Sequence, residues 1–140
     1  MKKIRAAVVG YGNIGQYTLQ ALEAANDFEV AGVVRRQGAK DKPAELEGYD
    51  VVADITELRD VDVAILALPT RECPAYAKRY LAMGINTVDS YDIHSGIVDY
   101  RAELMPVCKE HGRVSVISAG WDPGSDSIVR TLMQSLAPKG

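Results

Sequence analysis

The chain has 140 residues, the usual length of one domain, and 47% of them are hydrophobic, which suffices for a core without disulfide or metal cross-links. A net charge of -3 without a basic stripe argues against nucleic acid as a partner. No apolar run approaches the roughly 18 residues of a membrane span, and the start MKKIR lacks the apolar core of a signal peptide. We therefore expect a cytoplasmic protein without a membrane partner.

Apolar runs of strand length alternate with helix-like segments along the chain. The runs are nearly continuous, as in strands buried on both faces, and cover residues 3–10, 28–34, 61–68, 85–90 and 113–120, with a shorter candidate at 50–54. Helical patterns cover residues 14–25, 71–83, 97–111 and 126–136. The alternation predicts a Rossmann-type, doubly wound α/β fold with a mainly parallel sheet of about six strands.

A polar loop, the C-terminal helix and the two cysteines complete this outline. Residues 37–50 are polar and contain Gly and Pro, which predicts a surface loop. The helical pattern at the end either packs back on the sheet or leads into another domain, so we divide the chain into a dinucleotide-binding domain, 1–124, and a helix, 125–140, directed toward an absent domain. Cys73 and Cys108 stand far apart without nearby ligand partners, so we expect small hydrophobic side chains and no metal site.

The stretch VVGYGNIGQ carries the clearest functional signal. Gly10, Gly12 and Gly15 follow the first predicted strand and open the first predicted helix, which is the context of a dinucleotide-binding turn. In such a turn the first glycine permits the tight bend, the second lets pyrophosphate approach, and the third allows close helix packing. The pyrophosphate would lie at the helix N-terminus, where free N–H groups favour an anion.

The end of the second predicted strand indicates which nucleotide is bound. NAD-binding domains usually place an Asp or Glu there, whereas this strand ends in Arg35 and Arg36. Guanidinium groups are bidentate donors suited to a 2′-phosphate, so the pair favours NADP over NAD. The alternative is that both arginines are ordinary surface residues.

The exits of the later strands hold the remaining candidate residues. Pro69, Thr70 and Arg71 would line the cofactor cleft, although Thr70 could instead be a helix N-cap. Asp92 and Asp122 stand on neighbouring exits and would suit a substrate with an ammonium group. The alternatives are a helix cap for Asp92 and an Asx turn for Asp122. We expect His94 to be a surface or hydrogen-bonded histidine and His111 to be a cation at a helix end.

Taken together, VVGYGNIG, the arginine pair, TVDSYDIH and ISAGWDPG followed by SI.R resemble the meso-diaminopimelate dehydrogenases, and the resemblance spans the whole chain. It implies NADP-dependent oxidative deamination of the D-centre of meso-2,6-diaminopimelate to L-2-amino-6-oxopimelate, which cyclises to tetrahydrodipicolinate, with release of ammonia, in lysine biosynthesis. It also implies a homodimer in the full-length enzyme. GYGN.G alone fits many dehydrogenases, but SYD.H with GWDPG is far more specific.

The resemblance also assigns roles to residues. It implies pyrophosphate contacts from Tyr11, Gly12, Asn13 and Ile14, between the flanking Gly10 and Gly15, and 2′-phosphate contacts from Arg35 and Arg36. It implies that the rest of the cofactor cleft is lined by Pro69, Thr70, Arg71, Ser90, Tyr91, Ala119, Gly120, Trp121 and Pro123. Substrate contacts would come from Asp92, Trp121 and Asp122, and either aspartate could assist deprotonation of the amine.

The chain departs from this family in its length, because members continue into a dimerisation and substrate-binding region. We therefore expect weak NADP binding and little or no turnover from these 140 residues. Two other interpretations are a stand-alone NADP-binding or sensor module and another NADP-linked oxidoreductase, such as a relative of homoserine dehydrogenase or dihydrodipicolinate reductase. The crowded strand exits at Asp92, Trp121 and Asp122 argue against the first, and GWDPG argues against the second.

Overall fold

The computed structural model describes residues 2–139 and contains one six-stranded sheet in the order β3-β2-β1-β4-β5-β6, with every strand pair parallel. The strands are β1 (Ile4–Val9), β2 (Phe28–Val34), β3 (Val51–Val52), β4 (Val63–Leu66), β5 (Asn86–Asp89) and β6 (Ser115–Val116). This order reverses at β1, as in doubly wound Rossmann folds. The predicted fold class is thus confirmed, and the weak candidate at 50–54 is an edge strand.

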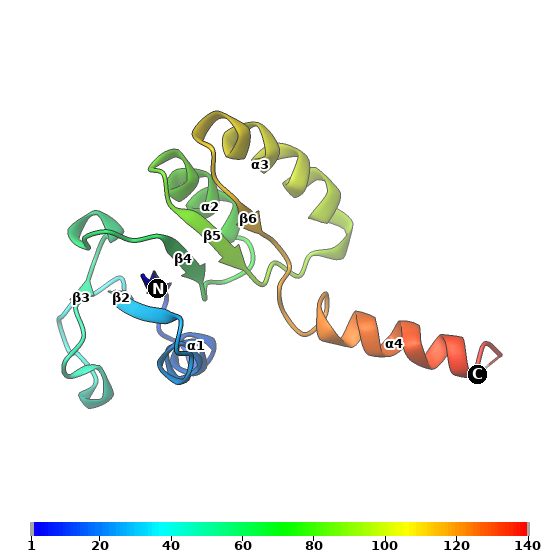
Figure 1. Cartoon of the computed structure of the whole chain (residues 1–140), viewed down its shortest axis with the longest axis horizontal. Coiled ribbons are helices and arrows are strands. Elements are labelled where there is room, and N and C mark those ends of the chain that lie inside the picture. Colours follow the sequence, from blue (N-terminus) through cyan, green and yellow to red (C-terminus); the bar gives the residue numbers. More distant parts are fainter. Residues whose placement is uncertain (1, 140) are drawn as a thin grey trace.

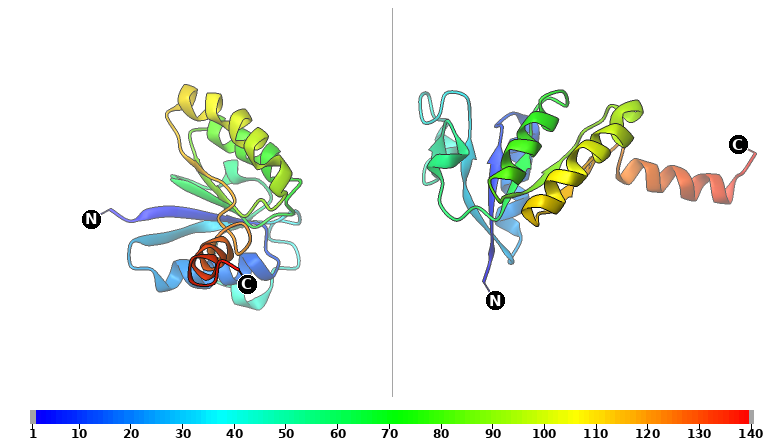
Figure 2. Two further views of the ribbon diagram at one scale, coloured as in Figure 1. Left: turned by 90° about the vertical axis from the view of Figure 1, so that its right-hand side faces the viewer. Right: turned by 90° about the horizontal axis from the view of Figure 1, so that it is seen from above.

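One face of the sheet is covered by α1 (Asn13–Ala24), as Figures 1 and 2 show. The buried residues of α1 are Gly15, Leu19 and Leu22, which form one stripe at helical spacing. They belong to a core cluster that includes Ala6 and Val8 of β1. The polar segment 37–50 crosses the surface as predicted, but it is anchored in this cluster by Leu46, which is fully buried.

The opposite face is covered by α2 (Cys73–Ala82) and α3 (Ile97–His111), as Figure 2 shows edge-on. Alternate residues of β1, Ala7 and Val9, point into this second core. Both helices end before a glycine with positive φ, Gly84 at 81° and Gly112 at 60°, as their sequences predicted. Both cysteines behave as expected, with Cys73 buried and Cys108 half-buried.

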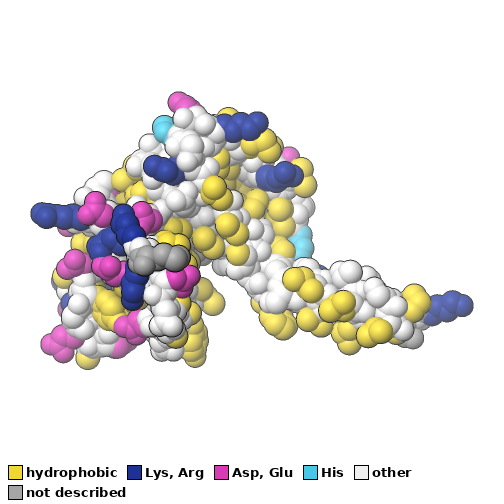
Figure 3. Space-filling model, viewed as in Figure 1, with side chains coloured by type: hydrophobic (Ala, Val, Ile, Leu, Met, Phe, Trp, Pro, Cys, Tyr) yellow, Lys and Arg dark blue, Asp and Glu magenta, His cyan; other side chains and the backbone are white. Residues whose placement is uncertain are grey.

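The last helix, α4 (Ser125–Leu136), extends away from the sheet and has no buried residue (Figures 1 and 2). The alternative that it packs back on the sheet is therefore wrong. Its hydrophobic side chains are between 46% and 87% exposed and comprise Ile128, Val129, Leu132, Met133 and Leu136. Figure 3 shows hydrophobic atoms along this helix. Within residues 2–139, no helix has the length and apolarity needed to span a membrane.

Candidate functional site: a nucleotide cleft at the carboxyl edge of the sheet

The turn between β1 and α1 needs glycine at two positions because the backbone is crowded there. Gly10 has φ +94°, and a Cβ atom at this position would lie 2.3 Å from the carbonyl oxygen of Ala67. A Cβ atom at Gly15 would lie 2.2 Å from the carbonyl oxygen of Gly10. Each distance is far below van der Waals contact. The bend predicted for Gly10 and the close helix packing predicted for Gly15 are therefore present.

Gly12 differs from its two neighbours because no protein atom requires it to be glycine. A Cβ atom there would meet nothing within 4 Å, and φ is -90°, which any residue adopts. Gly12 is also the N-cap of α1, and no side chain caps the free N–H groups of the first turn. An open approach to uncapped N–H groups fits a phosphate-bearing ligand. The residues present thus suit the pyrophosphate of a dinucleotide.

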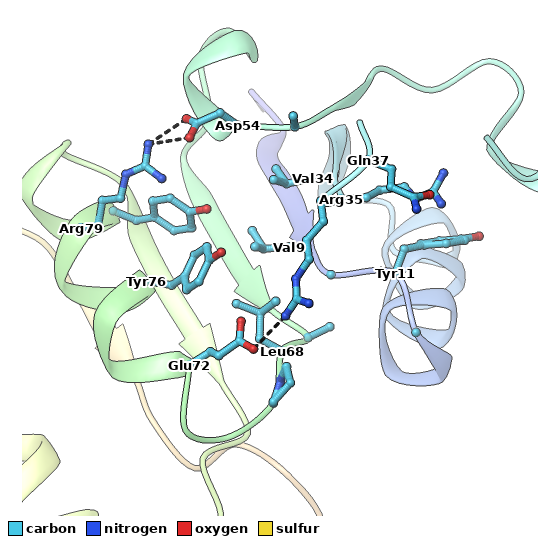
Figure 4. A pocket seen from close by; sticks show the side chains of 17 residues that line it. Val9, Tyr11, Val34, Arg35, Gln37, Asp54, Leu68, Glu72, Tyr76 and Arg79 are labelled. Carbon is cyan, nitrogen blue, oxygen red and sulfur yellow. Dashed lines mark hydrogen bonds and ion pairs between the residues drawn. The ribbon is translucent and has the colours of Figure 1, made fainter. Parts of the chain in front are cut away.

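A pocket of about 440 Å³ opens beside this turn (Figure 4). Six of the predicted cofactor residues line it, namely Gly10, Tyr11, Gly12, Arg35, Arg36 and Pro69. Its walls come from the carboxyl ends of β1, β2 and β3, the turn after β4, and α2 as far as Tyr80. This is where open parallel sheets bind their ligands, at the point where strand order reverses.

The two arginines at the tip of β2 differ in how they are held. Nη1 of Arg35 donates a long hydrogen bond to the carbonyl oxygen of Asp41 at 3.3 Å. Nη2 of Arg36 pairs with Oε1 of Glu72 at 3.0 Å, and the Arg36 side chain is 83% exposed. Both arginines line the pocket, so they are not merely scattered surface charges. Their guanidinium groups make the β2 end of the pocket cationic.

A second ion pair closes the far wall of the pocket. Nη2 of Arg79 contacts both carboxylate oxygens of Asp54, at 2.8 Å and 2.7 Å. Asp54 also accepts from the backbone N–H of Thr56, and with Glu57 it forms a capping box around a short helical turn. The Thr56 hydrogen bond and then the Arg79 guanidinium lower the pKa of Asp54 to about 2. The pair therefore stays charged at neutral pH and ties the exit of β3 to α2.

Sequence reasoning missed several residues that line the pocket, namely Gln37 after the arginine pair and Asp54, Glu72, Tyr76 and Arg79. Attention to strand exits could not find the residues of α2, because they lie up to two turns into a helix. The motif DITE does carry the signature of a capping box, an Asp followed three residues later by Glu, and could have located Asp54.

The exits of β5 and β6 are joined by a buried carboxylate, Asp89. Its Oδ1 accepts from the backbone N–H groups of Tyr91 at 2.9 Å and Ser118 at 3.1 Å, and its Oδ2 accepts from the Tyr100 hydroxyl at 2.7 Å. Its backbone oxygen accepts from Ala119. Burial, followed by the bond to Asp89, raises the pKa of Tyr100, so this hydroxyl keeps its proton. Asp89 thus fixes both exits and is not free to bind a substrate.

The exit of β4 is linked to that of β5 through Thr70. Its Oγ1 accepts from the backbone N–H of Asp92 at 3.0 Å. Thr70 is therefore not the N-cap of α2; that position is held by Glu72, which makes no capping bond. Asp92 does not cap the following helical turn, His94–Gly96, either. The N-cap of that turn is Ile93, and no side chain makes a capping hydrogen bond there. The Asp92 side chain is exposed at the edge of the sheet.

Asp122 lies in a tight loop after β6, within a cis Asp122–Pro123 peptide. Its Oδ1 is 3.1 Å from Nη2 of Arg130 and 3.7 Å from Nε2 of His94. Among residues 2–139 the alternative Asx turn is not formed, and the carboxylate contacts these side chains. His94 is thus exposed at the surface, as expected, and its neighbour is one of the two predicted substrate aspartates.

Other predicted cofactor residues follow the same edge outside the pocket. A Cβ atom at Gly120 would lie 3.3 Å from Cβ of Ser90, which puts the β5 and β6 exits in contact. Trp121 is 69% exposed, whereas Tyr91 is buried with its ring 4.7 Å from that of Tyr100. Any cofactor contact at Tyr91 must therefore come from its backbone. The predicted cofactor residues that do not line the pocket are Asn13, Ile14, Gly15, Thr70, Arg71, Ser90, Tyr91, Ala119, Gly120, Trp121 and Pro123.

Comparison with known proteins agrees with this geometry. Residues 4–89, which contain the glycine turn and the arginine pair, match the oxidoreductase family with an NAD-binding Rossmann fold. The chain belongs to this family. The match ends at Asp89, so the Asp92 and Asp122 exits lie beyond it.

Within the oxidoreductase family, the chain is similar to dehydrogenases of amino acids. It is 71% identical over all 140 residues to the meso-diaminopimelate D-dehydrogenase of Bacteroides fragilis and covers 47% of that protein. A mutant meso-dapdh from Clostridium tetani, solved with DAP, has a TM-score of 0.80 and 34% identity, with 99% of this chain and 43% of that chain covered. An engineered D-amino acid dehydrogenase bound to NADP+ has a TM-score of 0.77 and 30% identity, and the match covers 96% of this chain and 42% of that chain. The chain thus spans about half the length of the relatives it matches.

Proposed function

We propose that this chain is the nucleotide-binding part of an NADP-dependent meso-diaminopimelate D-dehydrogenase. The observation that carries the proposal is the 71% identity to the Bacteroides fragilis enzyme over every residue of the chain. The pocket beside Gly12, with Arg35 and Arg36 at one end, supports NADP as the cofactor. The D-amino acid dehydrogenase that shares this fold was solved with NADP+, which supports the same choice.

In this proposal each group at the sheet edge has a separate task. The N-terminus of α1 and the open face of Gly12 hold the pyrophosphate, and the arginines hold the 2′-phosphate. Bound NADP supplies a hydride acceptor for the carbon that carries the amine. The residues of the β5 and β6 exits orient the substrate at the edge of the sheet, where correct alignment lowers the barrier.

We assign the contact with the substrate ammonium to Asp92. Its carboxylate is exposed and makes no ion pair among residues 2–139, whereas Asp122 is already paired with Arg130. For Asp122 to bind an ammonium group it would have to exchange this partner, so we give it the task of positioning the loop that carries Trp121. The sequence alone left the choice between the two aspartates open.

The setting of the enzyme follows from the same relationship. The substrate is a small molecule, meso-2,6-diaminopimelate, and the product feeds lysine biosynthesis. We further propose a homodimer for the full-length enzyme, a cytoplasmic location, and no nucleic-acid or membrane partner. Residues 1–124 form the nucleotide-binding domain, and residues 125–140 lead toward a substrate and dimerisation region.

A hybrid enzyme tests the proposed activity directly. The corresponding first part of the Bacteroides fragilis enzyme is replaced by this chain, and NADPH formation with meso-diaminopimelate is measured. We expect turnover with NADP, and a loss of kcat for Asp92→Asn that exceeds the loss for Asp122→Asn. A hybrid that folds and binds NADP but forms no NADPH would contradict the proposal. Equal losses for the two variants would contradict only the assignment of Asp92.

A further inference from the structure

A carboxylate lies among the cations that the proposed site offers to a nucleotide. Glu72 stands at the N-cap of α2, and its Oε1 accepts from Nη2 of Arg36 at 3.0 Å. Figure 4 shows the Glu72 side chain reaching from α2 toward the tip of β2 within the pocket. The pair thus joins the two sides of the pocket at the place where a 2′-phosphate would contact Arg36.

The two partners of this ion pair differ in exposure. The Glu72 side chain is 34% exposed, and the Arg36 side chain is 83% exposed. Glu72 is therefore the more firmly seated partner, next to a helix N-terminus that favours a negative charge. Arg36 is the more mobile one, because an exposed ion pair of this kind is weak and exchanges readily. A second anion close to the pocket could take over the guanidinium.

The 2′-phosphate of NADP is such an anion, and NAD lacks it. A guanidinium binds carboxylate and phosphate through the same donors, so an Arg36 engaged by Glu72 offers fewer of them to the phosphate. The Glu72 carboxylate also repels the phosphate across a short distance. Both effects weaken NADP binding most, because NAD has no phosphate beside Arg36 and only its more distant pyrophosphate senses the Glu72 carboxylate.

We propose that Glu72 is a specificity-determining residue that competes with the 2′-phosphate of NADP for Arg36. This inference rests on the proposed function, because it requires that the pocket bind NADP. In the unsubstituted chain the carboxylate restrains the preference for NADP that Arg35 and Arg36 create. NAD-binding domains usually carry an acidic side chain at the tip of β2, which this chain lacks. Glu72, at the N-cap of α2, provides a carboxylate at that place instead.

Calorimetric titration of the full chain with NADP, NAD and 2′,5′-ADP tests this inference. We expect Glu72→Gln to tighten NADP and 2′,5′-ADP binding about fivefold, with a smaller gain at high salt, and to leave NAD binding nearly unchanged. The matched control is Glu103→Gln, which removes a carboxylate from another exposed ion pair, with Lys78, outside the pocket. It should change no affinity. The gain should be clearly smaller in the background of Arg36→Ala, where only the direct repulsion between the carboxylate and the phosphate remains. Thermal unfolding verifies that each variant is folded.

Several outcomes would overturn the inference. Weaker NADP binding by Glu72→Gln would mean that the carboxylate positions Arg36 for the phosphate. If Glu72→Gln raised the affinity for NAD equally, or if Glu103→Gln raised the affinity for NADP by the same factor, the effect would come only from the net charge of the protein. NADP binding that depends on Arg36 but ignores Glu72 would remove the inference and leave the proposed function intact. If the unsubstituted chain binds neither dinucleotide, the proposed function fails and this inference fails with it.

Discussion

At the scale of single residues, the three glycines of the first turn differ in why they are glycine. Gly10 and Gly15 lack room for a side chain, because a Cβ atom at either position would strike a backbone carbonyl oxygen. Gly12 has open space where its side chain would be. The fold therefore accounts for the first and third glycines, whereas the second is explained by the nucleotide that we propose to bind there.

This difference predicts opposite phenotypes for two alanine variants. Gly15→Ala should destabilise the protein by about 2 kcal/mol, because overpacking forces α1 away from the turn. Gly12→Ala should keep the free energy of unfolding within about 1 kcal/mol, yet weaken NADP binding roughly tenfold by obstructing the approach to α1. Urea denaturation and calorimetric titration measure the two effects. A Gly12→Ala variant that binds NADP normally would show that no ligand approaches at this position.

Residue by residue, the sequence predicted best where a strand or a turn imposes a requirement on the backbone. The glycine spacing and the arginine pair identified one end of the pocket correctly, because strand exits converge at one edge of a parallel sheet. Glu72 and Arg79 escaped notice, since their place in the pocket depends on how α2 lies against the sheet. The burial of Asp89 among hydrogen-bond donors was not foreseen either, because sequence does not reveal whether a carboxylate is buried.

At the scale of elements, the ion pair between Asp54 and Arg79 is the clearest link between the edge of the sheet and α2. The pKa of Asp54 is lowered from 3.8 to about 2, so the folded protein holds this proton more weakly than the unfolded chain does. The ionised Asp54 carboxylate therefore contributes its full stabilisation above about pH 4, and this stabilisation is lost as the pH falls toward 2.

The variant Asp54→Asn tests this link because it retains an acceptor for Thr56 but removes the charge. We expect a free energy of unfolding about 1 kcal/mol below that of the unsubstituted protein at pH 7, a small value because the pair is partly exposed to solvent. The difference should close between pH 4 and pH 2, as measured by urea denaturation over that range. Asp27→Asn, at an exposed carboxylate, serves as the control. A gap that persists undiminished at pH 2 would contradict the assigned role.

The elements themselves were predicted with small errors that have physical causes. Strands buried on both faces give nearly continuous apolar runs, so all six were found, although β3 and β6 retain only two paired residues each. The predicted start of α2 at Arg71 was two residues early, because residues 70–72 form a turn before the helix. The loop at 37–50 was correctly placed, but its anchor, Leu46, could not be recognised within a polar segment.

At the scale of the whole molecule, the Rossmann body and α4 are separate structural parts. Their contacts include the ion pair of Arg130 with Asp122, while the apolar side chains of α4 remain exposed (Figure 3). The sequence predicted this helix but could not tell whether it packs on the sheet, since an amphipathic pattern does not identify the surface that it will cover.

Removal of residues 125–140 tests this division. Because α4 buries no residue, the shortened chain should unfold with a free energy within about 1 kcal/mol of that of the full chain, as surface changes generally do. It should also retain its affinity for NADP, since the pocket lies entirely within residues 1–124. Chemical denaturation followed by circular dichroism gives the first result and titration gives the second. A cooperative loss of structure on truncation would show that α4 is part of the same folding unit.

The most direct test of the central claim, that this chain holds NADP between the glycine turn and the arginine pair, is isothermal titration with NADP and separately with NAD. The titrations are repeated on the double variant Arg35→Ala, Arg36→Ala. We predict weak binding with a preference for NADP, and we predict that the double variant abolishes this preference while NAD binding stays the same. Equal affinity for both nucleotides in the unsubstituted chain, or a preference that survives loss of both arginines, would contradict the account.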